Sequence, residues 1–282
     1  MSRFVLLYTF HRTDRASLHR LMLFQRMNPD ITIVPVFGVA QTISFPIPKL
    51  PKRYREIFDW TSCRSRTLFK ITEAINKEVE SFRRQNQLNK LSVFLQNRGL
   101  KLYCDFTPIG KTNQDLAIIN WFSREGKNLD FDFAVYFEYD VFTTKTIDTL
   151  YKPYLHFNAG FVDYREAEPR WTWIDRPPGS KESVCNWLKT RGAEQRIYGG
   201  FFPGHFLSRK VLQTLTQQKL PNGFCEMRLP SVITGLGFSV ANLDFPQVHR
   251  TINPNGILEP EIKDKADNGI FHPVYGDFDF DC

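Results

Sequence analysis

Apolar residues along this chain occur in short continuous runs, with stretches of helical spacing between them. Residues 3–10 (RFVLLYTF) and 31–38 (ITIVPVFG) are apolar enough throughout to predict buried strands. Between them, Leu18, Leu21 and Met22 recur at helical spacing, and Asp14 is a candidate N-cap. Because strand, helix, strand usually builds a parallel sheet covered by helices, this opening predicts an α/β fold.

The same alternation continues along the rest of the chain. Apolar spacing predicts further helices over 65–82, 112–126, 180–192 and 205–218. Short apolar runs predict further strands over 101–106, 131–140, 156–164 and 238–245. The segment 43–52 has three prolines in six residues and is expected to be an extended surface loop. The turn-rich tail from residue 253 is expected to wrap the surface, and no linker divides the chain.

The run FAVYFEYDVF (133–142) ends its apolar stretch in two acids, Glu138 and Asp140. Alternate side chains of a strand share a face, so the two carboxylates are expected on one side. Ligands of parallel sheets bind beyond the carboxyl ends of the strands. Two carboxylates there suit a hard divalent cation that shares substrate phosphates, and the alternative is a solvated strand end.

The composition favours a globular protein and gives some indication of its partners and cellular compartment. The chain has 282 residues with 42% hydrophobic and 24% charged residues, which fits one large globular domain. The net charge of +7 favours anionic partners, although solubility alone also explains it. Its densest basic stretch, 49–58, could contact phosphate or phospholipid headgroups. Five widely spaced cysteines without a Cys-x-x-Cys pair indicate a reducing compartment, so we expect a cytoplasmic protein, with peripheral membrane contact as an option.

An acid-x-Asp element that ends an apolar strand, in a chain with this opening, resembles the Asp-x-Asp element of GT-A glycosyltransferases. The resemblance implies a Rossmann-type, mostly parallel central sheet flanked by helices. It implies Mn²⁺ or Mg²⁺ held by Glu138 and Asp140 against the diphosphate of a nucleotide-sugar. It also implies a single domain over 1–282, with the nucleotide-binding part over about 1–145 and the acceptor-binding part and tail over about 146–282. Glu138 departs from the family pattern, which makes Asp140 the firmer metal ligand.

Two later segments match the same family pattern in order. YGGFFPGHFLSR (198–209) resembles the glycine-containing segment, where Gly199 and Gly200 would let the backbone approach a sugar. An ordinary turn before a helix is the alternative. GIFHPV (269–274) resembles the late histidine element, in which His272 would be a third metal ligand, although lone histidines are more often structural.

GFCEMRLPS (223–231) resembles the acidic segment near the acceptor. Glu226 would act there as the general base if the reaction inverts the anomeric centre, because a base must remove the proton of the attacking hydroxyl. In a retaining reaction Glu226 would bind the acceptor or support the site. The alternative is a surface ion pair with Arg228 or Arg209.

The same resemblance implies that the nucleotide lies above the end of the first strand and above the start of the helix at 112. Gly110 and the two residues after it look like the end of a P-loop, but the required earlier glycine is Asp105, so the match fails. The candidate contacts to the base or the phosphates of the nucleotide are Thr9, Phe10, His11, Arg12, Lys111, Asn113 and Tyr139. The alternative is that Arg12 and Lys111 simply face solvent.

The resemblance therefore implies a metal-dependent transfer of sugar from a UDP- or GDP-linked donor to a glycan, polysaccharide or lipid-linked acceptor. The alternative is a non-catalytic or degenerate α/β nucleotide binder that acts as a partner subunit. Motifs of dinucleotide oxidoreductases, esterases and zinc peptidases do not occur in the sequence. Scattered basic residues without an aromatic-rich consensus strand argue against a nucleic-acid partner.

Overall fold

A computed structural model gives the fold of the greater part of the chain. It describes residues 3–10, 15–39, 43–46, 114–168, 171, 174, 179–248 and 256–275. The helix expected over 65–82, the strand expected over 101–106 and the cap Asp14 lie outside these ranges.

A seven-stranded sheet forms the centre of the described structure, in the order β3-β2-β1-β4-β7-β6-β8. Its strands are β1 (Phe4–Phe10), β2 (Thr32–Val39), β3 (Ile43–Pro46), β4 (Phe133–Glu138), β6 (Ala159–Glu166), β7 (Tyr198–Ser208) and β8 (Val240–Leu243). The pairings place β1, β2, β4, β6 and β8 in one direction, with β3 and β7 running against them. The predicted α/β class with a mostly parallel sheet is therefore confirmed.

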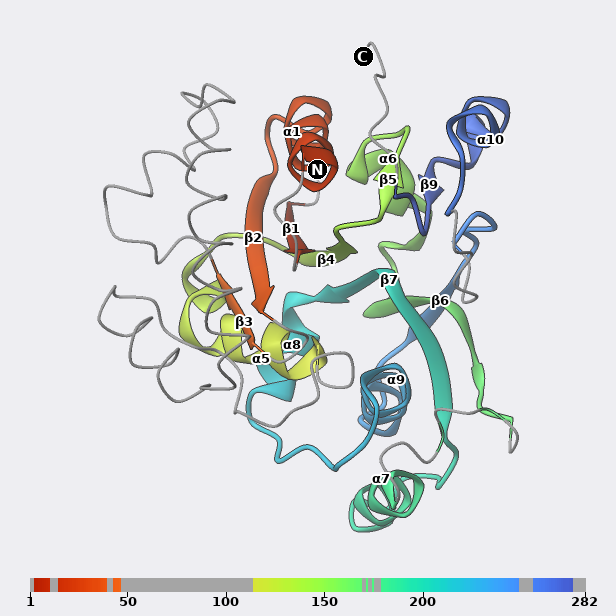
Figure 1. The fold of residues 1–282 in the computed structure, drawn as a ribbon. Coiled ribbons are helices and arrows are strands. Elements are labelled where there is room, and N and C mark those ends of the chain that lie inside the picture. The colour runs from red at the N-terminus through yellow and green to blue at the C-terminus, as the bar shows by residue number, and fades with distance from the viewer. Residues whose placement is uncertain are drawn as a thin grey trace, which may run out of the picture.

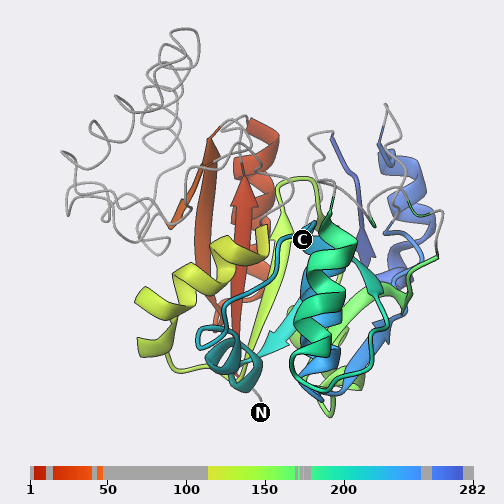
Figure 2. The same ribbon diagram turned by 90° about the horizontal axis from the view of Figure 1, so that it is seen from below.

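Helices cover both faces of this sheet (Figure 1). They are α1 (Arg15–Met27), α5 (Gln114–Arg124), α6 (Ile147–Tyr151), α7 (Ser180–Lys189), α8 (Arg209–Leu215), α9 (Cys225–Gly235) and α10 (Glu259–Asp264). Helices α1 and α6 pack on one face, and α5, α7, α8 and α9 on the other, which faces the viewer in Figure 2. Among the described residues, no helix is both long and apolar enough to cross a membrane.

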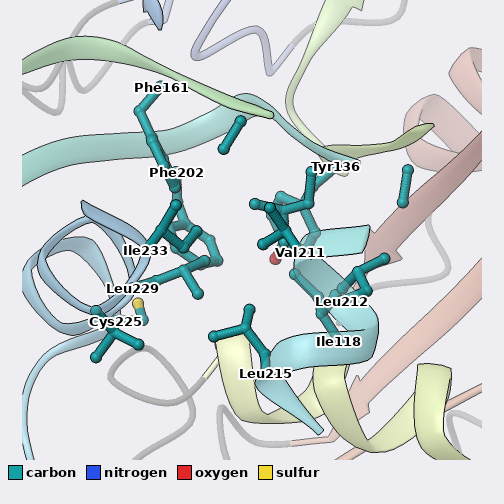
Figure 3. Packing of buried hydrophobic residues seen from close by; sticks show 14 of the residues in the cluster. Ile118, Tyr136, Phe161, Phe202, Val211, Leu212, Leu215, Cys225, Leu229 and Ile233 are labelled. Atoms are coloured by element: carbon teal, nitrogen blue, oxygen red, sulfur yellow. The ribbon is translucent and has the colours of Figure 1, made fainter. Parts of the chain in front are cut away.

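The continuous apolar runs of the central strands follow from this double covering. Along β1, Leu6 and Tyr8 point into the core shared with α1, whereas Val5 and Leu7 point into the core shared with α5. A strand buried on both faces has no solvent side, so it carries no alternating polar positions. Figure 3 shows the second core, where Tyr136 from the sheet faces the apolar side chains of α8 and α9.

Two expectations about local structure are wrong. The segment 43–46 is not a loop but β3, which pairs antiparallel with β2. Because β3 is an edge strand of the described sheet and Pro46 is its last residue, the missing N–H costs little. Residues 47–52 of the expected loop lie outside the described ranges.

The segment 198–208 is likewise not a turn followed by a helix from residue 205. It forms the eleven-residue strand β7, and α8 begins only at Arg209. Pro203 and Gly204 lie between the paired residues Phe201 and Phe206, where the register against β6 shifts. The backbone of Gly204 has φ +82°. An irregularity of this kind accommodates both residues inside a central strand.

The tail contributes to the core as well as the surface. Ile262, Ile270, Phe271 and Val274 are buried. Strand β9 (Ile270–Phe271) pairs antiparallel with β5 (Phe142–Thr143), directly after the acid pair, in a separate two-stranded sheet. The C-terminal segment is thus joined to the end of β4.

Candidate metal centre at the end of strand β4

Glu138, Asp140 and His272 come together in the folded protein. One ligand atom from each of the three side chains lies within 4.8 Å of the others. Asp140 and His272 are buried, and Glu138 is half-buried. The predicted clustering of the two acids with the late histidine is therefore observed.

The two acids meet through a turn rather than through strand alternation. Strand β4 ends at Glu138, and Tyr139 and Asp140 form a turn in which Val141 N donates to Glu138 O at 3.0 Å. The carbonyl oxygen of Tyr139 accepts bonds from Arg20 Nε at 2.8 Å and from the Tyr8 hydroxyl at 3.2 Å. Arg20 is buried on α1. The turn that carries Asp140 is thus fixed to both α1 and β1.

The short antiparallel pairing of β5 with β9 places His272 beside the two acids. Phe142 pairs with Phe271, so the antiparallel register brings the residue after Phe271 alongside the acid turn. Two backbone bonds complete the attachment: Val274 N donates to Asp140 O at 2.8 Å, and His272 N donates to Gln247 O at 3.0 Å. The imidazole also contacts the ring of Phe201, with centroids 5.3 Å apart.

The donor set fits a divalent cation. Asp140 Oδ1 is buried without a hydrogen-bond partner among the described residues, and it lies 3.4 Å from His272 Nε2. A buried carboxylate oxygen in that state is costly unless something positive meets it. The carboxylates of Glu138 and Asp140, each with an oxygen within 4.8 Å of the other, also repel each other when both are charged. Carboxylate oxygens with one imidazole nitrogen are ligands that Mn²⁺ or Mg²⁺ accepts, and either ion would offset both costs.

Thr9 is held beside this group. It pairs with Glu138 in the β1–β4 ladder, and its hydroxyl donates to the Tyr136 hydroxyl at 2.9 Å. Burial, and then the nearby charge of Glu138, raise the pKa of Tyr136 well above its usual value, so this phenol stays neutral. Tyr139 is half-buried against the core on the α1 side. Contacts of Thr9 and Tyr139 to a nucleotide stay predictions.

Glu226 lies in the first turn of α9, and its Oε1 accepts a bond from Phe202 N at 3.3 Å. Phe202 follows Phe201, the residue whose ring contacts His272, so Glu226 is tied to the strand that borders the metal centre. Neighbouring Cys225 is no candidate nucleophile, because burial raises the pKa of its thiol well above the usual value. The role of Glu226 as a base stays a prediction.

Both arginines weighed as partners of Glu226 bind other groups in the structure. Arg228 forms a bidentate pair with Asp115 of α5, with distances of 2.7 Å from Nε to Oδ2 and 2.5 Å from Nη2 to Oδ1. Both side chains are buried. Arg209 donates to the backbone carbonyls of Leu129 and Lys127.

Packing inside the protein explains Gly199 and Gly200. A Cβ on Gly199 would lie 2.9 Å from the ring of Trp171, and one on Gly200 would lie 2.6 Å from the Cβ of Phe161. Both glycines are buried. The space above each is therefore used by the protein's own aromatic side chains, and an approach of a sugar to them stays a prediction.

Several candidate nucleotide contacts cannot be placed. His11, Arg12, Lys111 and Asn113 lie outside the described residues, and only the backbone of Phe10 is described. Three side chains around the centre were not anticipated from the sequence, namely Gln114, Arg20 and Tyr8. Each acts through a contact between distant segments, and no local sequence pattern signals such a contact.

Comparison of the chain with models of protein families finds no matching family, and comparison with curated proteins finds no matching relative. The functional argument therefore rests on the geometry of the centre and on the motifs in the sequence.

Proposed function

We propose that this protein is a metal-dependent glycosyltransferase that moves a sugar from a nucleoside-diphosphate sugar to a hydroxyl acceptor. The observation that carries the proposal is the meeting of Glu138, Asp140 and His272 at the carboxyl end of β4, with Asp140 Oδ1 buried and lacking a hydrogen-bond partner among the described residues. Sheets of this class bind ligands at this end of their strands.

The GT-A assignment is part of the same proposal. It is supported by the α/β sheet with five strands in one direction and helices on both faces. It is also supported by the order of the motifs along the chain, from the first strand through the acid pair to the late histidine. We propose a UDP- or GDP-linked donor and a glycan, polysaccharide or lipid-linked acceptor on the same grounds.

The chain's own residues have distinct tasks in this scheme. Glu138, Asp140 and His272 would hold Mn²⁺ or Mg²⁺, which when bound supplies positive charge against the departing diphosphate. Arg20 and Tyr8 keep the acid turn in place through the carbonyl of Tyr139. If the reaction inverts the anomeric centre, Glu226 takes the proton of the acceptor hydroxyl. If it retains configuration, Glu226 binds the acceptor or supports the site.

The first test is thermal unfolding with UDP or GDP, in Mn²⁺ and in EDTA. We expect stabilisation by the nucleotide only when Mn²⁺ is present, of about 2.7 kcal/mol at a ligand concentration of a hundred times Kd. Asp140→Ala should remove this stabilisation and abolish transfer in a screen of nucleotide-sugars. Asp130→Asn is the matched control, because it removes a carboxylate that is 79% exposed.

Two results would contradict the proposal. Nucleotide stabilisation that ignores Mn²⁺ would favour a nucleotide-binding partner subunit without catalysis. Wild-type turnover in Asp140→Ala would remove the metal centre from the mechanism altogether.

A further inference from the structure

The side chain of Gln114 makes a direct contact with one of the three candidate metal ligands. Gln114 is the first residue of α5, and its Nε2 donates to Glu138 Oε1 at 3.1 Å. Both residues are half-buried. The bond joins the start of a helix on one face of the sheet to the last residue of the central strand β4.

The chemistry of this donor matters as much as its position. A lysine or arginine here would cancel the charge of Glu138 and repel a cation, whereas an amide is neutral and leaves that charge intact. A carboxylate offers about four lone-pair positions, and one amide N–H occupies one of them. The bond therefore restricts the orientation of the carboxylate without preventing it from acting as a ligand.

The start of α5, which carries Gln114, is firmly packed against the rest of the protein. The next residue, Asp115, is fully buried and paired with Arg228 of α9, and its Oδ1 also accepts a bond from Leu116 N at 2.9 Å. Further along α5, Ile118 and Trp121 are buried in the core. A hydrogen-bond donor at the start of a packed helix keeps a more constant position relative to its acceptor than a donor on a loop does.

We propose that Gln114 is a positioning residue of the candidate metal centre, whose amide holds the Glu138 carboxylate in the orientation that binds the cation. The inference rests on the proposed function, because it needs Glu138 to be a ligand. Partners that orient a ligand are worth about 10- to 100-fold in metal affinity.

Titration of the whole protein with Mn²⁺, followed by the electron paramagnetic resonance signal of free Mn²⁺, tests this without any turnover. Gln114→Met keeps the length of the side chain and removes the donor, and we expect Mn²⁺ to bind about 10- to 100-fold more weakly. Gln213→Met on α8 is the matched control, because Gln213 is an exposed helical glutamine; its affinity should equal that of wild type. Gln114→Ala replaces the Met variant if the latter fails to fold.

A double-mutant cycle separates positioning from a general effect on the fold. If Gln114 acts through Glu138, then Gln114→Met should weaken Mn²⁺ binding in wild type but cause no further loss in a Glu138→Ala background. Equal losses in both backgrounds would overturn the inference, as would a Gln114→Met affinity within about threefold of wild type, well short of the loss expected for an orienting partner.

The same titration distinguishes this inference from the proposed function. Tight binding by wild type that Asp140→Ala abolishes, together with an unaffected Gln114→Met, would overturn the role of Gln114 alone. Failure of wild type to bind Mn²⁺ better than Asp140→Ala would overturn both.

Discussion

Two groups of ionisable side chains in this protein, one fully buried and one partly buried, are built in opposite ways. Asp115 and Arg228 join opposite charges, and both carboxylate oxygens accept a bond from the guanidinium. Glu138, Asp140 and His272 bring two acids together, and Asp140 Oδ1 lacks a hydrogen-bond partner within the described structure. The first group is electrically complete and ties α5 to α9. The second sets two acids beside one imidazole, with His272 Nε2 3.4 Å from Asp140 Oδ1, and it is the group that a bound cation would complete under the proposed function.

The largest effect on stability should come from breaking the Asp115–Arg228 pair. Arg228→Ala leaves the charge of Asp115 buried and uncompensated, so we expect a loss of about 3–5 kcal/mol in the free energy of unfolding, measured by urea denaturation. The double variant Asp115→Leu with Arg228→Met should recover most of that loss, because it removes both charges together. A single variant as stable as wild type would show that the pair does not brace the helices.

An intermediate effect on stability is expected at a second histidine, His205. Like the Asp115–Arg228 pair, it has its hydrogen-bond partner inside the protein. Its Nδ1 donates to the carbonyl of Phe202 at 2.6 Å, and the aromatic rings of Tyr136 and Phe161 pack against it. Burial lowers the pKa of His205 from 6.5 to about 3. Between pH 6.5 and about pH 3, the unfolded chain therefore binds a proton at this histidine, whereas the folded protein does not.

The free energy of unfolding should consequently fall as the pH drops from 6.5 towards 3, by about 1.4 kcal/mol for each pH unit. Between pH 7 and pH 5 the wild type should lose about 2 kcal/mol more than His205→Phe does. Urea denaturation at both pH values measures this difference. His156→Phe, which changes an exposed histidine, should lose as much as wild type; equal losses in wild type and His205→Phe would refute the assignment.

The smallest effect on stability should come from a change in the group of Glu138, Asp140 and His272. In EDTA, Asp140→Asn replaces a buried charge by a neutral amide of the same shape, which relieves its repulsion with Glu138. We expect a change in unfolding free energy of less than about 1 kcal/mol, in keeping with sites that are built for a ligand rather than for stability. A loss as large as that of Arg228→Ala would instead make Asp140 and His272 a structural ion pair and remove the contrast between the two groups.

The sequence predicted well those features that depend on neighbouring residues. The apolar runs before Thr9 and before Glu138 are strands, and the α/β class follows from their alternation with helices. It predicted poorly wherever tertiary pairing overrides local preference. Gly199, Gly200 and Pro203 suggested a turn, yet they lie in the central strand β7, because pairing with β6 continues across a register shift that accommodates the proline. Glycine is required at 199 and 200 because Trp171 and Phe161 fill the space above them.

The sequence by itself determined that two carboxylates would lie at the end of a buried strand, because strand formation and the end of an apolar run are local properties. Only the tertiary structure decided that His272 would join them, since the two-residue ladder between β5 and β9 depends on long-range pairing. It also decided that Asp115 would pair with Arg228, which is 113 residues away. Contacts of this kind arise from the packing of whole helices and strands, and no pattern among adjacent residues encodes them.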